Sequence, residues 1–396
     1  MLTEERKMET LNLCKNLISR RSYSGQEESV AMELEKYMES KGFDEIFYDE
    51  YGNIIGRIAG MHSGNKILFD GHMDTVPVGN YDDWDTDPFC PTIIDGKLYG
   101  RGASDMKGAI ASFVSAAAYF AQDTGKNFSG DIYVAGVVHE ECFEGVAARS
   151  ISKLVHPDVV VIGEASDLNL KIAQRGRAEI VLETFGIPAH SANPEQGVNA
   201  VYKMCKVVQE IAKLTPPVHP VLGKGILELT DIKSRPYPGA SVVPEYCRAT
   251  YDRRLLVGET KESVLAPIQQ LLERLMAVDP QLKAKVSYAE GRETCYTGFE
   301  ITGERFFPGW LDDEKDPRVL SMIRELNARG YAPKITQYNF CTNGSHYAGE
   351  AGIFTVGLGP SLEKLAHTVN EYVEIEQLEK AADCYMGMMK ALTKNS

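Results

Sequence analysis

The 396-residue chain lacks the features that mark several large classes of protein. It contains no apolar run close to the roughly 20 residues needed to cross a bilayer. Its charged beginning, Met1–Lys7, is followed by no apolar segment of the kind that a secretory signal carries. The net charge is −14, whereas nucleic-acid-binding proteins need a basic stripe. We therefore expect neither a membrane nor a nucleic acid as a partner.

Paired cysteines, internal repeats and low-complexity segments are absent as well. The eight cysteines occur singly, without a Cys-x-x-Cys pair, which favours reduced thiols in a cytoplasmic protein. Hydrophobic residues make up 43% of the chain and charged residues 25%, as is usual for globular proteins. The length exceeds that of one ordinary core, so we expect two domains.

Strand and helix patterns alternate in the first part of the chain and again at its end. Short apolar runs predict buried parallel strands, and apolar residues at helical spacing predict the helices between them. The predicted strands are 53–58, 66–70, 132–138, 159–162 and 353–358, and the helices include 8–18, 30–38, 109–121, 319–328 and 378–392. This alternation predicts an α/β fold in which helices cover a sheet on both sides.

The pattern changes after about Gln174. Strands are expected at 178–185, 225–232, 245–253 and 284–288, with helices at 196–214 and 262–276. This β-α-β-β-α-β order is typical of a small antiparallel sheet with two helices on one face, a ferredoxin-like α+β domain. We expect it to be an insertion at 175–289 in a discontinuous first domain formed by 1–174 and 290–396.

Potential metal ligands follow several of the predicted strands. His72 and Asp74 come after the predicted strand 66–70, and Glu140 and Glu141 follow the predicted strand 132–138. Asp105 lies in a glycine-rich turn before a helix. Open α/β sheets build active sites where strands give way to loops. Imidazole and carboxylate are ligands for divalent metals, so the three clusters together indicate a hydrolase with a metal centre.

Two further ligand candidates come later in the chain. Glu164 ends the strand 159–162, and His367 follows the turn Gly359-Pro360-Ser361. Adjacent carboxylates such as Glu140 and Glu141 must diverge, so one can bind metal while the other moves protons. Taken alone, a histidine such as His72 is more often structural, and Glu164 has an alternative role as a helix-capping carboxylate.

The combined motifs resemble those of the dinuclear zinc amidohydrolases typified by acetylornithine deacetylase, succinyl-diaminopimelate desuccinylase, aminoacylase-1 and glutamate carboxypeptidase. Within that family, the segments Thr342–Ser345 and Leu365–His367 with Glu371 and Tyr372 most resemble a subgroup of bacterial hydrolases linked to selenium metabolism and purine catabolism. The segments that carry the family resemblance are Gly71–Pro77, Tyr99–Gly108, His139–Glu141, Gly163-Glu164, Ala189–Pro194 and Gly359-Pro360 with His367.

The resemblance implies a role for each ligand candidate. Asp105 would bridge two Zn²⁺ ions per chain, for which Co²⁺ or Mn²⁺ could substitute. His72 and Glu164 would complete the first ion's ligands, and Glu141 and His367 those of the second. Asp74 would orient His72, and Glu140 would be the general base and acid.

The resemblance also implies substrate contacts, several of them on the inserted domain. His190 would reach from the partner subunit of a homodimer to stabilise the tetrahedral intermediate, although it could simply cap a turn. Arg254 would hold a substrate carboxylate, although it could be a surface cation. Ser241 stands where the family usually has Asn, and the candidate substrate loop Asn343-Gly344-Ser345 lacks an acidic residue that many relatives have. These departures concern the substrate and leave the reaction class unchanged.

The implied activity is hydrolysis of an amide bond in a small N-acyl or N-carbamoyl amino acid or a dipeptide, by a zinc-bound hydroxide. The alternatives are a broader amino- or carboxypeptidase and a non-catalytic peptide-binding relative. The complete ligand set argues against the second alternative. His139 replaces an Asp that is usual in the family, and we expect it, like His346, to serve packing or the surface.

Overall fold

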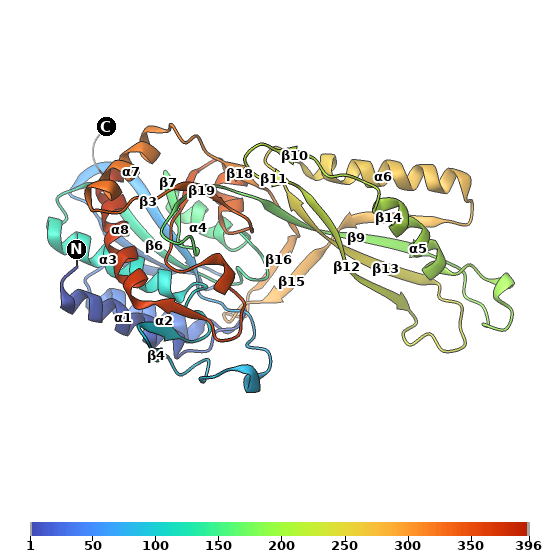
Figure 1. The fold of residues 1–396 in the computed structure, drawn as a ribbon, viewed down its shortest axis with the longest axis horizontal. Helices are drawn as coiled ribbons and strands as arrows, with labels where there is room; N and C mark the ends of the chain where they lie inside the picture. Colours follow the sequence, from blue (N-terminus) through green and yellow to red (C-terminus); the bar gives the residue numbers. More distant parts are fainter. Residues whose placement is uncertain (1, 394–396) are drawn as a thin grey trace. The chain divides into compact units, whose positions relative to one another are not determined.

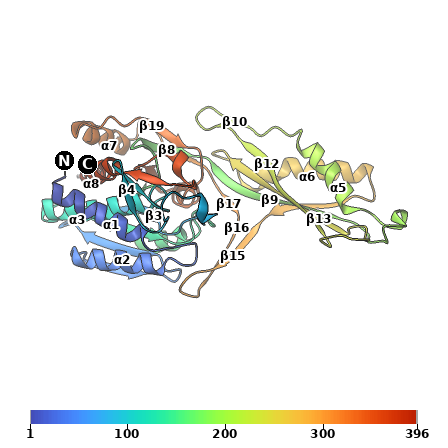
Figure 2. The ribbon, with the colours of Figure 1, turned by 60° about the horizontal axis from the view of Figure 1, so that its bottom comes forward.

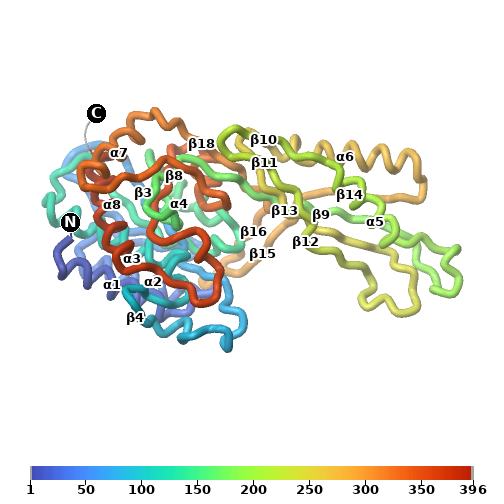
Figure 3. Tube along the Cα trace, viewed as in Figure 1, coloured from blue at the N-terminus to red at the C-terminus, as the bar shows by residue number. Residues whose placement is uncertain are grey.

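The computed structural model describes residues 2–393, which form two compact units. The first unit contains Met1–Gln174, Arg292–Thr302 and Leu311–Ser396, and the second contains Arg175–Gly291 and Gly303–Trp310 (Figure 1). The second unit is therefore an insertion in the first. The first and last helices, α1 (Glu4–Ile18) and α8 (Ile375–Leu392), both belong to the first unit and contact each other (Figure 3).

A mixed nine-stranded sheet forms the centre of the first unit, and its strand order is β1-β2-β6-β3-β7-β20-β8-β18, with β19 paired to β8. The neighbours β6, β3, β7 and β20 are parallel, whereas β1, β2 and β8 join the sheet antiparallel. The bounds are β1 Glu45–Tyr48, β2 Ile54–Ala59, β3 His62–His72, β6 Ser129–Val137, β7 Val159–Ile162, β8 Leu170–Gln174, β18 Trp310–Leu311, β19 Ile335–Tyr338 and β20 Phe354–Gly357.

Helices pack on this sheet and on one another. The alanine-rich helix α3 (Lys107–Thr124) contacts β3 and α8, and its small side chains are buried. Helix α2 (Glu28–Ser40) packs against β1 and β2, and α7 (Pro317–Ala328) packs against α8. The remaining helix of the unit is α4 (Ala148–Val155).

The order of the parallel strands determines where a site can form. The chain passes from β3 through α3 to β6 on one side, and from β6 through α4 to β7 on the other side of β3. Because such crossovers are right-handed, α3 and α4 lie on opposite faces of the sheet. The carboxyl end of β3 is thus a topological switch point, where open α/β sheets bind their ligands.

The first unit also contains a small three-stranded antiparallel sheet. It has the order β21-β5-β4, with β4 Thr92–Ile94, β5 Lys97–Tyr99 and β21 Tyr372–Glu374. This small sheet joins the segment before α3 to the segment before α8. A two-stranded hairpin, β15 (Glu290–Thr294) and β16 (Glu300–Glu304), connects the two segments of the second unit.

The second unit has the predicted β-α-β-β-α-β order. Its antiparallel strands β9 (Gly176–Phe185), β12 (Ile226–Arg235), β13 (Tyr246–Leu255) and β14 (Lys283–Tyr288) lie in the order β12-β13-β9-β14. Helices α5 (Ala200–Ile211) and α6 (Lys261–Val278) cover one face (Figure 2). Their shared core includes Ile180, Leu182, Met204, Val207, Ile268 and Leu272. This is the strand order of a ferredoxin-like sheet, so the predicted fold class is confirmed.

Two boundaries differ from those expected. Residues 303–310, expected in the first domain, group with the second unit because β17 (Phe306–Phe307) pairs with β9. Helix α5 is shorter than the expected 196–214, because the side chain of Asn199 caps it by accepting hydrogen bonds from two backbone N–H groups.

Among residues 2–393, no helix combines the length and the apolar character that a membrane span requires. Within the same residues, none of the eight cysteines forms a disulfide bond.

Candidate metal centre

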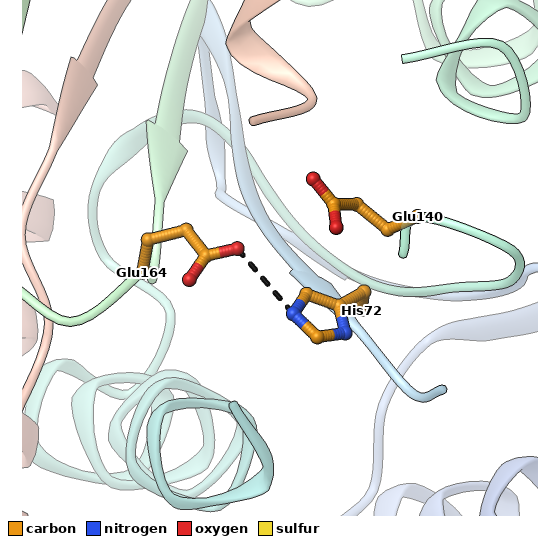
Figure 4. Close-up of side chains that lie close together, drawn as sticks. All are labelled: His72, Glu140 and Glu164. Atoms are coloured by element: carbon orange, nitrogen blue, oxygen red, sulfur yellow. Dashed lines mark ion pairs between the residues drawn. The ribbon is translucent and has the colours of Figure 1, made fainter. Parts of the chain in front are cut away.

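Seven of the candidate side chains come together at the carboxyl end of the parallel strands. His72 is the last residue of β3 and Asp74 lies two residues later, Glu140 and Glu141 follow β6, and Glu164 follows β7. Asp105 precedes α3, and His367 lies in the loop after β20. Figure 4 shows His72, Glu140 and Glu164 converging from three different strand ends. All of these residues belong to the first unit.

Asp105 joins the two histidines. Its Oδ1 lies 2.8 Å from Nε2 of His72, and its Oδ2 lies 3.2 Å from Nε2 of His367. Glu164 Oε1 is 3.4 Å from the same His72 nitrogen, and Glu141 Oε2 is 2.9 Å from the His367 nitrogen. Each oxygen of Asp105 therefore faces its own pair of one imidazole and one carboxylate.

The two pairs differ in exposure. The His72 side chain is 1% exposed and that of Glu164 6%, whereas the His367 side chain is 55% exposed. One side of Asp105 is thus enclosed, and the other opens to solvent through His367.

Asp74 contacts His72 through its backbone and the glutamate pair through its side chain. Nδ1 of His72 lies 2.8 Å from the carbonyl oxygen of Asp74 and 3.6 Å from its carboxylate. The carboxylate accepts hydrogen bonds from the N–H groups of Glu140 and Glu141, at 3.1 and 3.2 Å, and from the hydroxyl of Ser24 at 2.7 Å. Fully buried, Asp74 holds both the imidazole and the turn that carries the two glutamates.

The loop after β20 approaches the end of β7 very closely. A Cβ at Gly359 would lie 2.0 Å from the carbonyl oxygen of Gly163 and 2.4 Å from that of Glu164, so only glycine fits there. The carbonyl of Glu164 also accepts a hydrogen bond from the hydroxyl of Tyr338 at 2.9 Å. These contacts fix the backbone that presents the Glu164 side chain.

The electrostatics of the cluster follow from its buried carboxylates. Burial, followed by the charges of Glu164 and Glu141, raises the pKa of Glu140 well above its usual value. Burial also raises the pKa of Glu141 to about 7. Hydrogen bonds to Asp105 and Glu141 raise the pKa of His367 to about 10. The cluster thus strongly favours positive charge at its centre.

The donor set fits divalent cations. His72 with Glu140 and Glu164, and His72 with Asp105 and Glu141, each offer ligand atoms within 4.8 Å of one another. The Oε1 atoms of Glu140 and Glu141 are buried and have no hydrogen-bond partner among the described residues. Buried charges are stable when they are paired or coordinate a metal, and imidazole with carboxylate suits zinc and its neighbours.

Comparisons with known proteins agree with this geometry. The model of peptidase family M20/M25/M40 matches residues 68–391. The chain belongs to this family. The resemblance drawn from the sequence motifs is therefore confirmed, and the protein is an enzyme, a metal-dependent hydrolase of the M20 type.

Individual relatives span nearly the whole chain. "Uncharacterized protein YgeY" of Escherichia coli (strain K12) is 32% identical over 94% of this chain and 91% of its own length. A succinyl-diaminopimelate desuccinylase of Cereibacter sphaeroides is 26% identical over 97% of this chain and 98% of its own. The crystal structure of aminopeptidase PepT from Bacillus cereus shares the fold, with a TM-score of 0.75, 22% identity and coverage of 98% and 99%.

The candidates for substrate contact have different surroundings. In the second unit His190 and Ser241 are exposed, and Nε of half-buried Arg254 pairs with Oδ1 of Asp252 at 2.8 Å. In the first unit Asn343 is 2% exposed, and both the NH₂ group and the oxygen of its side-chain amide form hydrogen bonds inside the protein. It donates to Asp70 and accepts from the N–H of Gly145, both at 2.9 Å.

Gly344 and Ser345 are buried like Asn343. The N–H of Gly344 donates to the hydroxyl of Thr342, and the hydroxyl of Ser345 has no hydrogen-bond partner among the described residues. The contacts of Asn343 favour a structural role for this loop, and its role in substrate binding stays a prediction.

Two further residues around the centre, Glu371 and Glu27, were given no role by the sequence analysis. Glu371 accepts hydrogen bonds from the loop that carries Asp105, and Glu27 accepts the N–H of His139 at 3.2 Å. His139 is buried, in line with the expected packing role, and its ring meets that of Phe143 edge to face. The sequence signals for Glu371 are its part in the subgroup resemblance and its place four residues after His367, directly before a strand.

Proposed function

We propose that the protein hydrolyses the amide bond of a small N-acyl or N-carbamoyl amino acid or of a dipeptide, with two divalent ions, in the cytoplasm. One observation carries the proposal: the two oxygens of Asp105 face two separate imidazoles, each accompanied by a further carboxylate. A carboxylate whose two oxygens face two such sets is suited to a pair of neighbouring cations. No nucleic acid or membrane takes part.

The ligand assignment follows from these contacts. His72 and Glu164 would hold one ion, and Glu141 and His367 the other, with Asp105 shared between them. When bound, the ions polarise a substrate carbonyl and lower the pKa of water toward about 7. Zinc suits this donor set, and Co²⁺ or Mn²⁺ could replace it.

Glu140 is the residue that would move the proton. Its Oε1 is buried and has no partner among the described residues, although the N–H of Glu140 is held by Asp74. This unpartnered oxygen could accept a proton from the attacking water and pass it to the leaving amine. Buried next to the ligands, Glu140 can perform both transfers without leaving the site.

The second unit would supply the remaining contacts in a homodimer. Its edge strand β12 exposes Ile226 and Ile232, and on one side it has no neighbouring strand among residues 2–393. Such an edge is a ready template for pairing with a second copy, and an isologous contact uses it twice. His190 of the partner subunit would then stabilise the oxyanion, while Arg254 and Ser241 bind the substrate.

An amine-release screen tests this function. The metal-loaded protein is incubated with N-acetyl, N-succinyl and N-carbamoyl amino acids and with dipeptides, and the liberated amine is measured. The Glu140→Gln protein is the control, because it keeps the ligand set and lacks the proton acceptor. Release from at least one class by the wild type alone supports the proposal. Release only from longer peptides would favour the broader peptidase, and no release from any substrate would favour a binding protein.

A further inference from the structure

One buried carboxylate lies next to the centre without being among its proposed ligands. Glu371 is 0% exposed. Its Oε1 accepts the N–H groups of Ser104 and Asp105, at 2.7 and 3.0 Å. Its Oε2 accepts Nη1 of Arg101 at 2.6 Å and the N–H of Gly102 at 3.1 Å. All four donors come from one loop, 101–105, which ends in the bridging ligand.

This loop makes few hydrogen bonds of the kind found in helices or strands. It connects β5 to α3, and Gly102 has a φ of +87°, which lies outside both regular conformations. The three N–H groups that donate to Glu371 would otherwise be buried donors without partners, which is unfavourable. The carboxylate therefore determines the path of the loop as well as neutralising Arg101.

The same short segment carries a metal ligand. Glu371 is four residues after His367, and its backbone carbonyl accepts the N–H of Gly100 at 3.0 Å. Tyr372, the next residue, pairs with Tyr99 in the small sheet. The segment is thus attached to the strand end that precedes the Asp105 loop as well as to the loop itself, so the positions of His367 and Asp105 depend on each other.

We propose that Glu371 is a positioning residue for the metal centre, setting the bridging carboxylate of Asp105 relative to His367 through the loop 101–105. The inference rests on the proposed function, since it concerns the same centre. Glu371 does not bind the ions. It acts by holding the backbone of one ligand and by belonging to the segment of another.

An amide cannot replace the carboxylate in this position. All four partners of Glu371 are donors, so a glutamine would turn its own NH₂ group toward two of them, whichever way its amide is oriented. Glu371→Gln therefore keeps the size of the side chain and destroys half of the contacts. Glu371→Asp keeps the charge and the acceptors but is one methylene shorter, so it should restore part of the function.

A matched control exists on α8. Asp383 is 3% exposed and, like Glu371, is a buried carboxylate that pairs with an arginine. It accepts Nη1 of Arg329 at 2.9 Å and the hydroxyl of Tyr331 at 3.0 Å, and neither residue is a proposed ligand. Asp383→Asn should lower general stability as Glu371→Gln does, without acting on the loop 101–105.

The test measures zinc binding and amide hydrogen exchange in the loop 101–105 separately. Zinc per chain and the rate of zinc transfer to a chromogenic chelator are measured for the wild type, Glu371→Gln, Glu371→Asp and Asp383→Asn. Amide hydrogen exchange at Gly102, Ser104 and Asp105 is followed in the metal-free proteins. We expect Glu371→Gln to bind zinc about 10–100-fold more weakly, with faster exchange in the loop. Glu371→Asp should be intermediate, and Asp383→Asn should retain zinc like the wild type.

The outcomes separate this inference from the proposed function. Zinc binding by the wild type with unchanged zinc affinity in Glu371→Gln would overturn the inference alone. Equal zinc loss in Glu371→Gln and Asp383→Asn would also overturn it, because the effect would then be general destabilisation. A wild type that binds no zinc would overturn the proposed function together with the inference. Should Glu371→Gln fail to fold, the zinc affinity of Glu371→Asp decides in the same way.

Discussion

The metal cluster of the first unit and the substrate candidates of the second differ in how firmly the protein holds them. His72, Asp74 and Glu164 are buried, and each side chain or its backbone is fixed by further contacts. His190 and Ser241 are exposed, and Arg254 is held by a single carboxylate of its own strand. In the proposed function, bond cleavage would therefore rely on groups already fixed in one unit, whereas recognition would rely on groups that a ligand or a second subunit must still order.

The largest effect is expected at the residue that joins both halves of the cluster. Asp105→Ala removes the one carboxylate that faces both His72 and His367, so the protein should lose most of both ions and all measurable amidase activity. Elemental analysis of dialysed protein gives the metal content, with exposed Asp82→Ala as the control. Two retained ions per chain in the Asp105 variant would refute the ligand assignment.

The second-largest effect is expected at Glu140, where kcat should fall although the metal content stays unchanged. Glu140→Gln is nearly isosteric and cannot accept a proton, so kcat should fall by about 10²–10⁴ while both ions remain bound. Turnover and metal content are measured on the same sample. If the ions are lost instead, Glu140 is a ligand and Glu141 would be the candidate proton carrier.

A smaller loss is expected at the exposed histidine. His190→Ala should lower kcat by roughly 10²–10³, the usual cost of one oxyanion donor, without changing the metal content. Mixing this variant with Glu140→Gln sharpens the comparison of the two units. If His190 acts across a dimer, each heterodimer has one site with both defects and one with neither, so activity returns to about half. Activity that stays absent in demonstrated heterodimers would place His190 in its own chain's site.

Replacing Arg254 tests substrate binding separately from the chemical step. Arg254→Ala should raise KM by roughly 10–100-fold for substrates with a free carboxylate, since hydrogen bonds to charged groups contribute about 1.5–3 kcal/mol. Substrates in which that carboxylate is amidated should show little difference between the two proteins. An equal effect on both substrates would mean that the arginine supports the strand through Asp252.

The smallest effect on catalysis is expected at Asn343. Its amide is already occupied by Asp70 and Gly145, so Asn343→Ala should lower the free energy of unfolding by about 1–3 kcal/mol and leave KM nearly unchanged. Thermal unfolding and substrate titration measure the two quantities. A large rise in KM at unchanged stability would restore the substrate-binding role predicted from the sequence.

The sequence predicted the architecture and which side chains gather at the strand ends, because both depend on local patterns. Apolar runs followed by His72, Glu140 or Glu164 indicate strand ends, and parallel strands bring those ends to one edge. The strand β17 was missed because two residues are too short to show a period, and its pairing with β9 is a long-range contact.

The supporting contacts were harder to predict. Glu371 and Asp105 are 266 positions apart, and Asn343 and Asp70 are 273 apart, so no local pattern links either pair. The residue type is equally ambiguous. Asn343 lies in a loop, where an amide serves substrate binding or backbone support equally well, and only the three-dimensional contacts distinguish the two.

The central claim is that Asp105 bridges two ions, and anomalous diffraction from crystals of the zinc-loaded protein tests it most directly. We predict two peaks per chain about 3.5–4 Å apart, one beside each oxygen of the Asp105 carboxylate. The first should lie next to His72 and the second next to His367. A single peak, or two peaks of which only one contacts Asp105, would contradict the account.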